Sequence, residues 1–165
     1  MGGNDIGTYG SDYRLRTAAN LIGIWANTSS EALYFQAGRE EDGSPLNGSN
    51  IYLIHFPADQ LPDAVVQAYW SVILVSVPDY RVVPNRLGRY NLNSHSDLSY
   101  DPDGSLTIAV GPDPVPGVAE ANWLPSPPGK PFTLTFRTYV PIPAIKPPHG
   151  TWAPPALIRT DSQPS

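Results

Sequence analysis

An arginine in an alternating strand and a tryptophan in the loop before it are the residues of this sequence best suited to recognise a ligand. Trp123 stands in the proline-rich segment NWLPSPPGKP (122–131), and Arg137 stands in the apolar run that follows. An aromatic ring offers flat apolar area at little conformational cost, and a planar guanidinium matches a carboxylate or phosphate. The two residue types together raise the hypothesis of a binding site for a polar ligand.

Both residues also have a purely structural interpretation, which the sequence leaves open. Trp123 can close one end of a hydrophobic core, with Asn122 satisfying backbone groups of its own loop and the prolines stiffening the approach to the strand. Arg137 can form an ion pair or bond to loop carbonyls, because an unpaired charge in a strand is costly.

Other aromatic and basic residues extend the hypothetical binding site. The predicted ligand-binding residues are Trp70, Arg89, Tyr90, Trp123, Arg137 and Tyr139. Trp152 could share the aromatic surface, and Arg86 and Arg89, which flank Gly88, could join Arg137 in a pocket for an anion. Aromatic faces on jelly-roll domains commonly stack against sugars, so a saccharide or another small polar ligand is the expected partner.

The histidines and acidic residues do not form a recognisable catalytic or metal-binding pattern. His55, His95 and His149 lack the spacing of zinc ligands. The segment DPDGSLT (101–107) lacks the third acidic position and the distal glutamate of a calcium loop, and predicts a turn that starts a strand. We therefore expect no metal and no cofactor. A histidine beside a carboxylate in a concave pocket, His95 or His55, would be the sign of an enzyme.

Composition and charge narrow the classes of partner. The 165 residues carry a net charge of −5 and have Lys130 and Lys146 as their only lysines, whereas a nucleic-acid surface needs clustered Lys and Arg. No apolar run approaches the ~20 residues of a membrane span. The N-terminus has no basic, apolar signal peptide, so the chain as encoded would be cytoplasmic, but the sequence leaves the native compartment unknown. The absence of cysteine excludes disulfides and thiolate metal sites.

Short strands must position these residues, because apolar runs alternate with turn signals after residue 30. Strands are expected at 32–38, 51–56, 68–77, 80–84, 86–92, 105–111, 131–141 and 155–159, and the run at 68–77 is expected to be a central strand buried on both faces. In the run at 131–141, Phe132, Leu134 and Phe136 face one way, opposite Arg137. Seven to nine such strands predict an all-β sandwich.

One amphipathic helix is expected before the strands. Ser11 or Asp12 can cap it, and its apolar face comprises Leu15, Ala18, Ala19, Ile22 and Trp25. The length fits a single domain over residues 1–165, with the helix at about 11–27, the sandwich at about 31–159 and a flexible tail at 160–165.

Six sequence motifs, taken in order, resemble the bacterial domain of unknown function 1214. They are DGSPLNGSNIYLIHFP, AYWSV, NRLGRYNL, DPDGSLTI, NWLPSPPGKPFTLTFRTYVP and GTWAPP, and the resemblance covers about residues 9–159. It implies a jelly-roll-like β-sandwich preceded by a helix. Relatives usually carry this domain as the C-terminal half of a longer, often exported chain, behind the domain of unknown function 1254, which this sequence lacks. The family has no established activity.

Three functions remain open at this level. The preferred one is a ligand-binding or accessory module for a saccharide or another polar molecule of the cell envelope. One alternative is a hydrolase or lyase acting on such material. The other is a structural domain that docks on a companion domain or forms a homo-oligomer, for which an exposed apolar patch near the predicted helix would be the sign.

Overall fold

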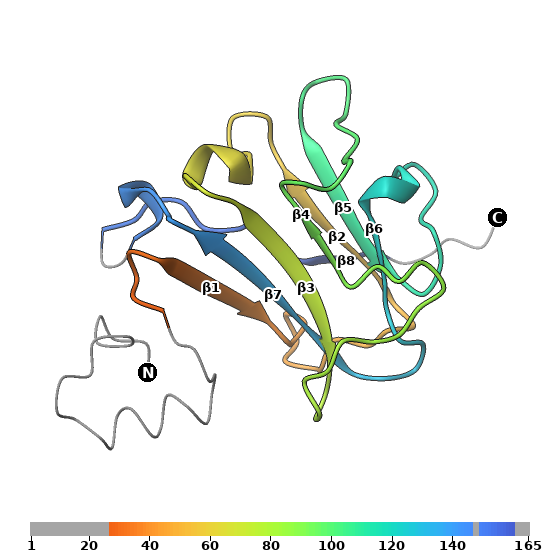
Figure 1. Cartoon of the computed structure of the whole chain (residues 1–165). Coiled ribbons are helices and arrows are strands. Elements are labelled where there is room, and N and C mark those ends of the chain that lie inside the picture. Colours follow the sequence, from red (N-terminus) through yellow and green to blue (C-terminus); the bar gives the residue numbers. More distant parts are fainter. Residues whose placement is uncertain (1–26, 147–148, 161–165) are drawn as a thin grey trace, which may run out of the picture.

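Two four-stranded β-sheets packed face to face make up the protein (Figure 1), whose computed structural model describes residues 27–146 and 149–160. The first sheet has the order β1 (Ala32–Ala37), β7 (Phe132–Tyr139), β3 (Trp70–Ser76) and β4 (Asn91–Asn93). The second has the order β6 (Trp123–Pro125), β5 (Leu106–Gly111), β2 (Ile51–Phe56) and β8 (Ile158–Thr160). Neighbouring strands are antiparallel, except that β5 and β6 are parallel.

Helical structure in the described residues is limited to three short 3₁₀ turns, η1 (Pro62–Val65), η2 (Glu120–Asn122) and η3 (Pro143–Ile145). The helix predicted over 11–27 and the tail predicted over 160–165 lie outside these residues, except for Asn27 and Thr160 at their ends. Within the described part of the chain, no helix is long and apolar enough to cross a membrane.

The predicted strands are confirmed where the apolar alternation is long. β1, β2, β3, β5 and β7 lie within the expected runs, whereas 80–84 contributes only a bridge between Val75 and Val82. β8 begins three residues later than expected and extends one residue further. β6 was not predicted, because three residues that end at a proline and follow a 3₁₀ turn carry no periodic signal.

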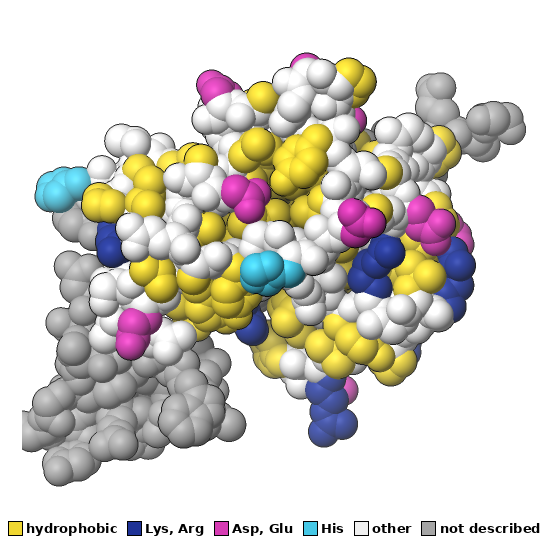
Figure 2. All heavy atoms as spheres, turned by 45° about the horizontal axis from the view of Figure 1, so that its top comes forward, with side chains coloured by type: hydrophobic (Ala, Val, Ile, Leu, Met, Phe, Trp, Pro, Cys, Tyr) yellow, Lys and Arg dark blue, Asp and Glu magenta, His cyan; other side chains and the backbone are white. Residues whose placement is uncertain are grey.

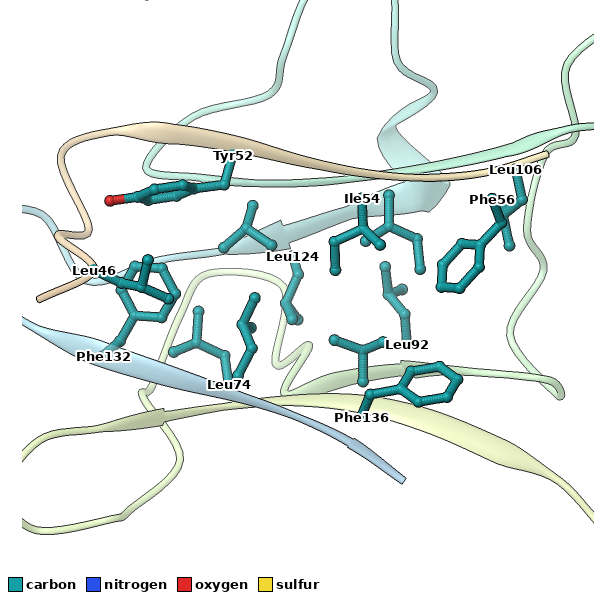
Figure 3. Packing of buried hydrophobic residues seen from close by; sticks show 14 of the residues in the cluster. Leu46, Tyr52, Ile54, Phe56, Leu74, Leu92, Leu106, Leu124, Phe132 and Phe136 are labelled. Atoms are coloured by element: carbon teal, nitrogen blue, oxygen red, sulfur yellow. The ribbon is translucent and has the colours of Figure 1, made fainter. Parts of the chain in front are cut away.

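The core lies between the sheets and follows the alternation of β7. Phe132, Leu134 and Phe136 point inward and are buried, as expected, while Arg137 points to the outer face. Figure 3 shows side chains of both sheets meeting in this space, with Ile54 and Phe56 of β2 opposite Phe136. The core is therefore built from the inner rows of both sheets.

One expectation about the core was wrong. The strand at β3 was predicted to be buried on both faces, and it does lie inside its sheet, between β7 and β4. Its inner residues Trp70, Val72 and Leu74 are buried, but Ile73 and Val75 on the outer face are only half-buried. A long apolar run thus identified an internal strand without requiring a third layer over it.

The proline-rich loop after β6 packs against the turn before β2. The backbone N–H of Gly48 donates to Lys130 O at 2.9 Å, and the Ser126 hydroxyl donates to Gly48 O at 2.7 Å. A β-carbon added at Gly48 would lie 1.9 Å from Pro127 O. The approach of the two backbones therefore requires glycine, and the prolines hold the loop in the shape that this contact needs.

Candidate functional site

Trp123 lies at the end of the core rather than on a rim. Its side chain is 1% exposed, and its indole N–H donates to Gly111 O at 2.9 Å. The Arg86 guanidinium lies over the ring at 5.3 Å from the centroid, and Arg89 donates to the carbonyl oxygens of Glu120 and Trp123. Trp123 therefore closes one end of the hydrophobic core, as its structural interpretation proposed. Arg86 covers its ring, and Arg89 holds the backbone of its segment.

Asn122 joins three segments of backbone. Its amide oxygen accepts from Ser99 N at 2.9 Å, and its amide nitrogen donates to Ser99 O at 2.6 Å and to Thr107 O at 3.0 Å. The side chain is 3% exposed. Asn122 was expected to satisfy its own loop, but it instead ties η2 to the loop at Ser99 and to β5.

The remaining predicted aromatic residues are distributed over several places. Trp70 is fully buried and stacks near Phe136, and its indole N–H is enclosed without a hydrogen-bond partner. Tyr90 is 38% exposed beside β4, and Trp152 is half-buried with its edge against Phe35. The two buried tryptophans offer no face to a ligand.

Arg137 and Tyr139 instead belong to a group on the outer face of the first sheet. The strand register places Tyr34 of β1, Arg137 of β7, Ser71 of β3 and Asn93 of β4 in one row across the sheet. The Arg137 guanidinium lies over the Tyr34 ring, 5.8 Å from its centroid. This row gathers residues that are up to 103 positions apart in the sequence, from Tyr34 to Arg137.

Two further tyrosines extend the row at the end of β7. The rings of Tyr69 and Tyr139 are stacked, with centroids 4.3 Å apart and planes 12° from parallel, and the His95 ring lies 5.9 Å from Tyr69. We call Tyr34, Tyr69, Arg137 and Tyr139 the tyrosine–arginine surface. Sequence reasoning missed Tyr34 and Tyr69, although the alternation of ALYFQAG could have placed Tyr34 on the face opposite Phe35.

The Arg137 side chain has neither of the structural partners expected for it. Among the described residues no carboxylate and no carbonyl accepts a hydrogen bond from its guanidinium, and its Nε is enclosed without a partner. Arg86 and Arg89, for which a shared anion pocket with Arg137 was left open, contact the segment at Glu120–Trp123 instead. Arg137 is therefore a cation whose described neighbours are aromatic rings.

The electrostatics of this surface are dominated by burial and by the neighbouring Tyr139. Burial is the main cause that raises the pKa of Tyr34 and Tyr69, and Tyr139 raises it further, because two neighbouring phenolates repel each other and the hydrogen bond to Tyr139 favours the neutral phenol. The positive charge of Arg137 opposes this rise in both residues, since it stabilises a nearby phenolate.

Replacing Arg137 by glutamine is therefore expected to raise the pKa of Tyr34 and Tyr69 above their wild-type values. Titration of ¹³Cζ-labelled tyrosine by NMR measures the change residue by residue. Tyr52 serves as an internal control, because its raised pKa has burial as its main cause and involves no arginine. Unchanged or lowered pKa values for both Tyr34 and Tyr69 would contradict the assigned role of the arginine charge.

The other titratable groups do not form a catalytic arrangement in the described part of the chain. His55 Nδ1 lies 3.1 Å from Thr107 Oγ1, which donates to Asp101 at 3.1 Å, so a threonine stands between the exposed His55 and this carboxylate. His95 is also exposed and makes its side-chain contact with Tyr69. Neither histidine lines either of the two cavities described below.

The acidic residues in the turn before β5 accept hydrogen bonds from the turn itself. Asp103 accepts from the backbone N–H of Ser105 at 3.0 Å and from its hydroxyl at 2.6 Å, and Gly104 has a φ of 83°. The prediction of a turn that starts β5 is thus confirmed. Over residues 27–146 and 149–160, no group of three or more His, Asp or Glu side chains is arranged to hold a metal ion.

Two cavities open on the described surface. One, of about 290 Å³, is bordered by Glu40, Tyr52 and Arg159, where Glu40 accepts from the Tyr52 hydroxyl at 2.7 Å and from Arg159 at 3.2 Å. The other, of about 250 Å³, is apolar and lies between the sheets. Figure 2 shows the Lys and Arg side chains of the described residues dispersed over one face and interspersed with Asp and Glu.

This all-β domain, with its surface of tyrosines around Arg137, belongs to the family of proteins of unknown function DUF1214, whose model matches residues 31–143. The resemblance noted in the sequence is thereby confirmed for this domain. No curated protein matches the sequence.

Two solved structures are similar to this chain to different degrees. The VPA0106 protein from Vibrio parahaemolyticus is 26% identical, with a TM-score of 0.70 over 87% of this chain. This chain spans 34% of the length of that protein. A putative uncharacterised protein from Burkholderia cenocepacia is 16% identical, with a TM-score of 0.42, and is covered over 41% of its length.

Proposed function

We propose that this domain is a ligand-binding or accessory module, and that its tyrosine–arginine surface binds a saccharide that carries a carboxylate, or a similar polar anion. The observation that carries the proposal is the Arg137 guanidinium, which has no acceptor among the described residues and lies beside three tyrosines. A partly enclosed cation binds most favourably to a ligand that supplies the missing hydrogen-bond acceptor. The tyrosine rings supply apolar area for the face of a sugar.

The proposed site keeps Arg137 and Tyr139 from the residues expected in the sequence, and adds Tyr34 and Tyr69. Tyr34 is 43% exposed, so its ring can contact a ligand without any change in the core. The chain has a net charge of −5, so a cation without a carboxylate partner among the described residues is a distinctive feature for binding an anion.

The connectivity of the strands is the second part of the proposal. We propose jelly-roll connectivity, because the chain passes from one sheet to the other between most consecutive strands, as it does from β1 to β2, from β2 to β3 and from β6 to β7. Jelly-roll domains commonly present aromatic residues to saccharides, which is consistent with the proposed ligand.

A comparison of acidic and neutral sugars tests the proposal. Glucuronate oligosaccharides are expected to raise the melting temperature of the domain more than the corresponding glucose oligosaccharides, because a ligand of the native state stabilises it by mass action. Arg137→Gln is expected to lower the affinity for the acidic ligand at least about tenfold in calorimetric titration, since hydrogen bonds to a charged group are lost. Arg81→Gln, at an exposed arginine away from the row, is the matched control and should bind like the wild type.

Two results would count against the site. One is equal stabilisation by acidic and neutral sugars, and the other is unchanged affinity in a folded Arg137→Gln variant.

Docking on a companion domain is the second candidate function. It is supported by length, since this chain spans only about a third of the Vibrio parahaemolyticus protein that shares its fold. In that case the tyrosine–arginine surface would pair with an acidic surface of the companion, and no small saccharide would shift the melting temperature.

A further inference from the structure

A second feature, separate from the tyrosine–arginine surface, is the apolar cavity of about 250 Å³ between the two sheets. One wall comes from the inner faces of β1 and β7, including Phe35 and Phe136, and the other from β2, including Ile54 and Phe56. Figure 3 shows Ile54 and Phe56 directed across the space toward the strand that carries Phe136. The cavity is thus the continuation of the core toward one side of the sandwich.

Residues 153–157, which we call the strap, border this side, where the cavity opens on the surface. They include Pro154 and Pro155 and line the cavity together with the two sheets. The chain is fastened at both ends of the strap, by the bond from Trp152 N to Ala144 O at 3.1 Å and by the pairing of Ile158 with β2. Between these ends, the strap residues make no hydrogen bond in the described structure.

The walls determine what the cavity can hold. Gln36 is the only polar residue among the described residues that line the cavity, and it lies in register with Thr135 of the outer face. Among the described residues, the enclosed side-chain atoms without a partner, Trp70 Nε1 and Arg137 Nε, do not belong to the lining. Ordered water needs two to four polar partners, whereas apolar cavities stay dry and take up apolar molecules. The space therefore favours an apolar occupant over water.

The size of the cavity restricts the occupant further. A cavity of roughly 150 Å³ is enough to bind benzene, and pockets for drug-sized ligands start at roughly 300 Å³. The cavity here lies between these two volumes. This range suits a compact apolar group with somewhat more carbon atoms than benzene.

We propose that the cavity is a binding site for a compact apolar molecule or side group, of the class of an alkylbenzene or a medium-length alkyl chain. The occupant enters where the cavity opens on the surface and packs against the strap. Because the strap makes no hydrogen bond to the described residues, it can shift to fit the occupant without breaking a hydrogen bond there. The two prolines keep the strap extended and remove two N–H groups that would otherwise need partners over an apolar space.

Titration of the methyl-labelled chain with butylbenzene tests this site directly. Saturable ¹³C-methyl shifts are expected at Ile54, Leu134 and Leu157, which line the cavity. Ile73, on the outer face of the first sheet, should not shift. Triethylene glycol, a flexible polar molecule, should leave all four methyl signals unchanged.

A cavity-filling variant supplies the second test. Ala37 lines the cavity. Ala37→Leu is expected to lower the affinity for butylbenzene at least about tenfold, because the added carbon atoms take up part of the cavity. Ala68→Leu, at an exposed alanine outside the cavity, is the matched control. Arg137→Gln should also bind butylbenzene like the wild type, which separates this site from the proposed saccharide site.

Three results would overturn the proposal. They are no saturable shift in the wild type, shifts centred on Ile73 instead of the lining residues, and unchanged affinity in a folded Ala37→Leu variant. If Ala37→Leu does not fold, the methyl shifts of the wild type decide the question alone.

Discussion

Trp123→Ala is expected to lower the free energy of unfolding by about 3–5 kcal/mol, the range found when large aromatic side chains are removed from a core. The ring is almost completely buried between β5 and the segment held by Arg89. Its removal leaves a cavity and deprives Gly111 O of its bond from the indole. Equilibrium unfolding in urea measures the loss.

A comparison with Trp70 separates packing from hydrogen bonding. Both tryptophans are buried, but the indole N–H of Trp123 donates to Gly111 O, whereas that of Trp70 has no partner. Trp123→Phe is therefore expected to cost about 1–2 kcal/mol more than Trp70→Phe, which removes an unsatisfied donor. Equal losses in the two variants would show that the Gly111 bond contributes nothing measurable.

Asn122→Asp is expected to lower the free energy of unfolding by about 3–5 kcal/mol at neutral pH, because it places an uncompensated charge in a buried position. The Asn122 amide nitrogen donates to Ser99 O and Thr107 O, and a carboxylate would direct its lone pairs at the same two oxygens. Burial and these carbonyls would raise the pKa of the new carboxyl in the folded state. Stability should therefore fall as the pH rises above the unfolded value of about 3.9.

Urea unfolding of the wild type and the variant at pH 4 and pH 7 measures this effect. The gap between them should be wider at pH 7, where the carboxyl must be ionised. Asn47→Asp is the matched control, because the oxygen of Asn47 accepts from Ser49 N and its nitrogen donates to no described residue. A gap that does not depend on pH, or an equal loss in Asn47→Asp, would contradict the explanation.

The sequence predicted the parts of this protein that depend on local periodicity. Alternation over 131–141 correctly placed Phe132, Leu134 and Phe136 opposite Arg137, because successive side chains of a strand point to opposite faces. The Asp-Gly signal at 103–104 correctly marked the turn before β5. The order of motifs was also sufficient for the family.

The members of the candidate site could not be predicted in the same way. The sequence grouped Arg137 with Trp70, Trp123 and Arg89, whereas the register of β1 and β7 places Tyr34 opposite Arg137. Likewise, Asn122 bonds to Ser99 and Thr107, which are 23 and 15 residues away.

By itself, then, the sequence determined the two faces of β7, the turn before β5 and the family. Only the tertiary structure decided that Arg137 lies among tyrosines, that Trp123 is enclosed, and that the strap borders an apolar cavity. The physical reason is that the face of a side chain follows from a repeat of two residues, which is written locally. The neighbours on that face follow from strand register and sheet order, which are fixed by contacts between distant segments.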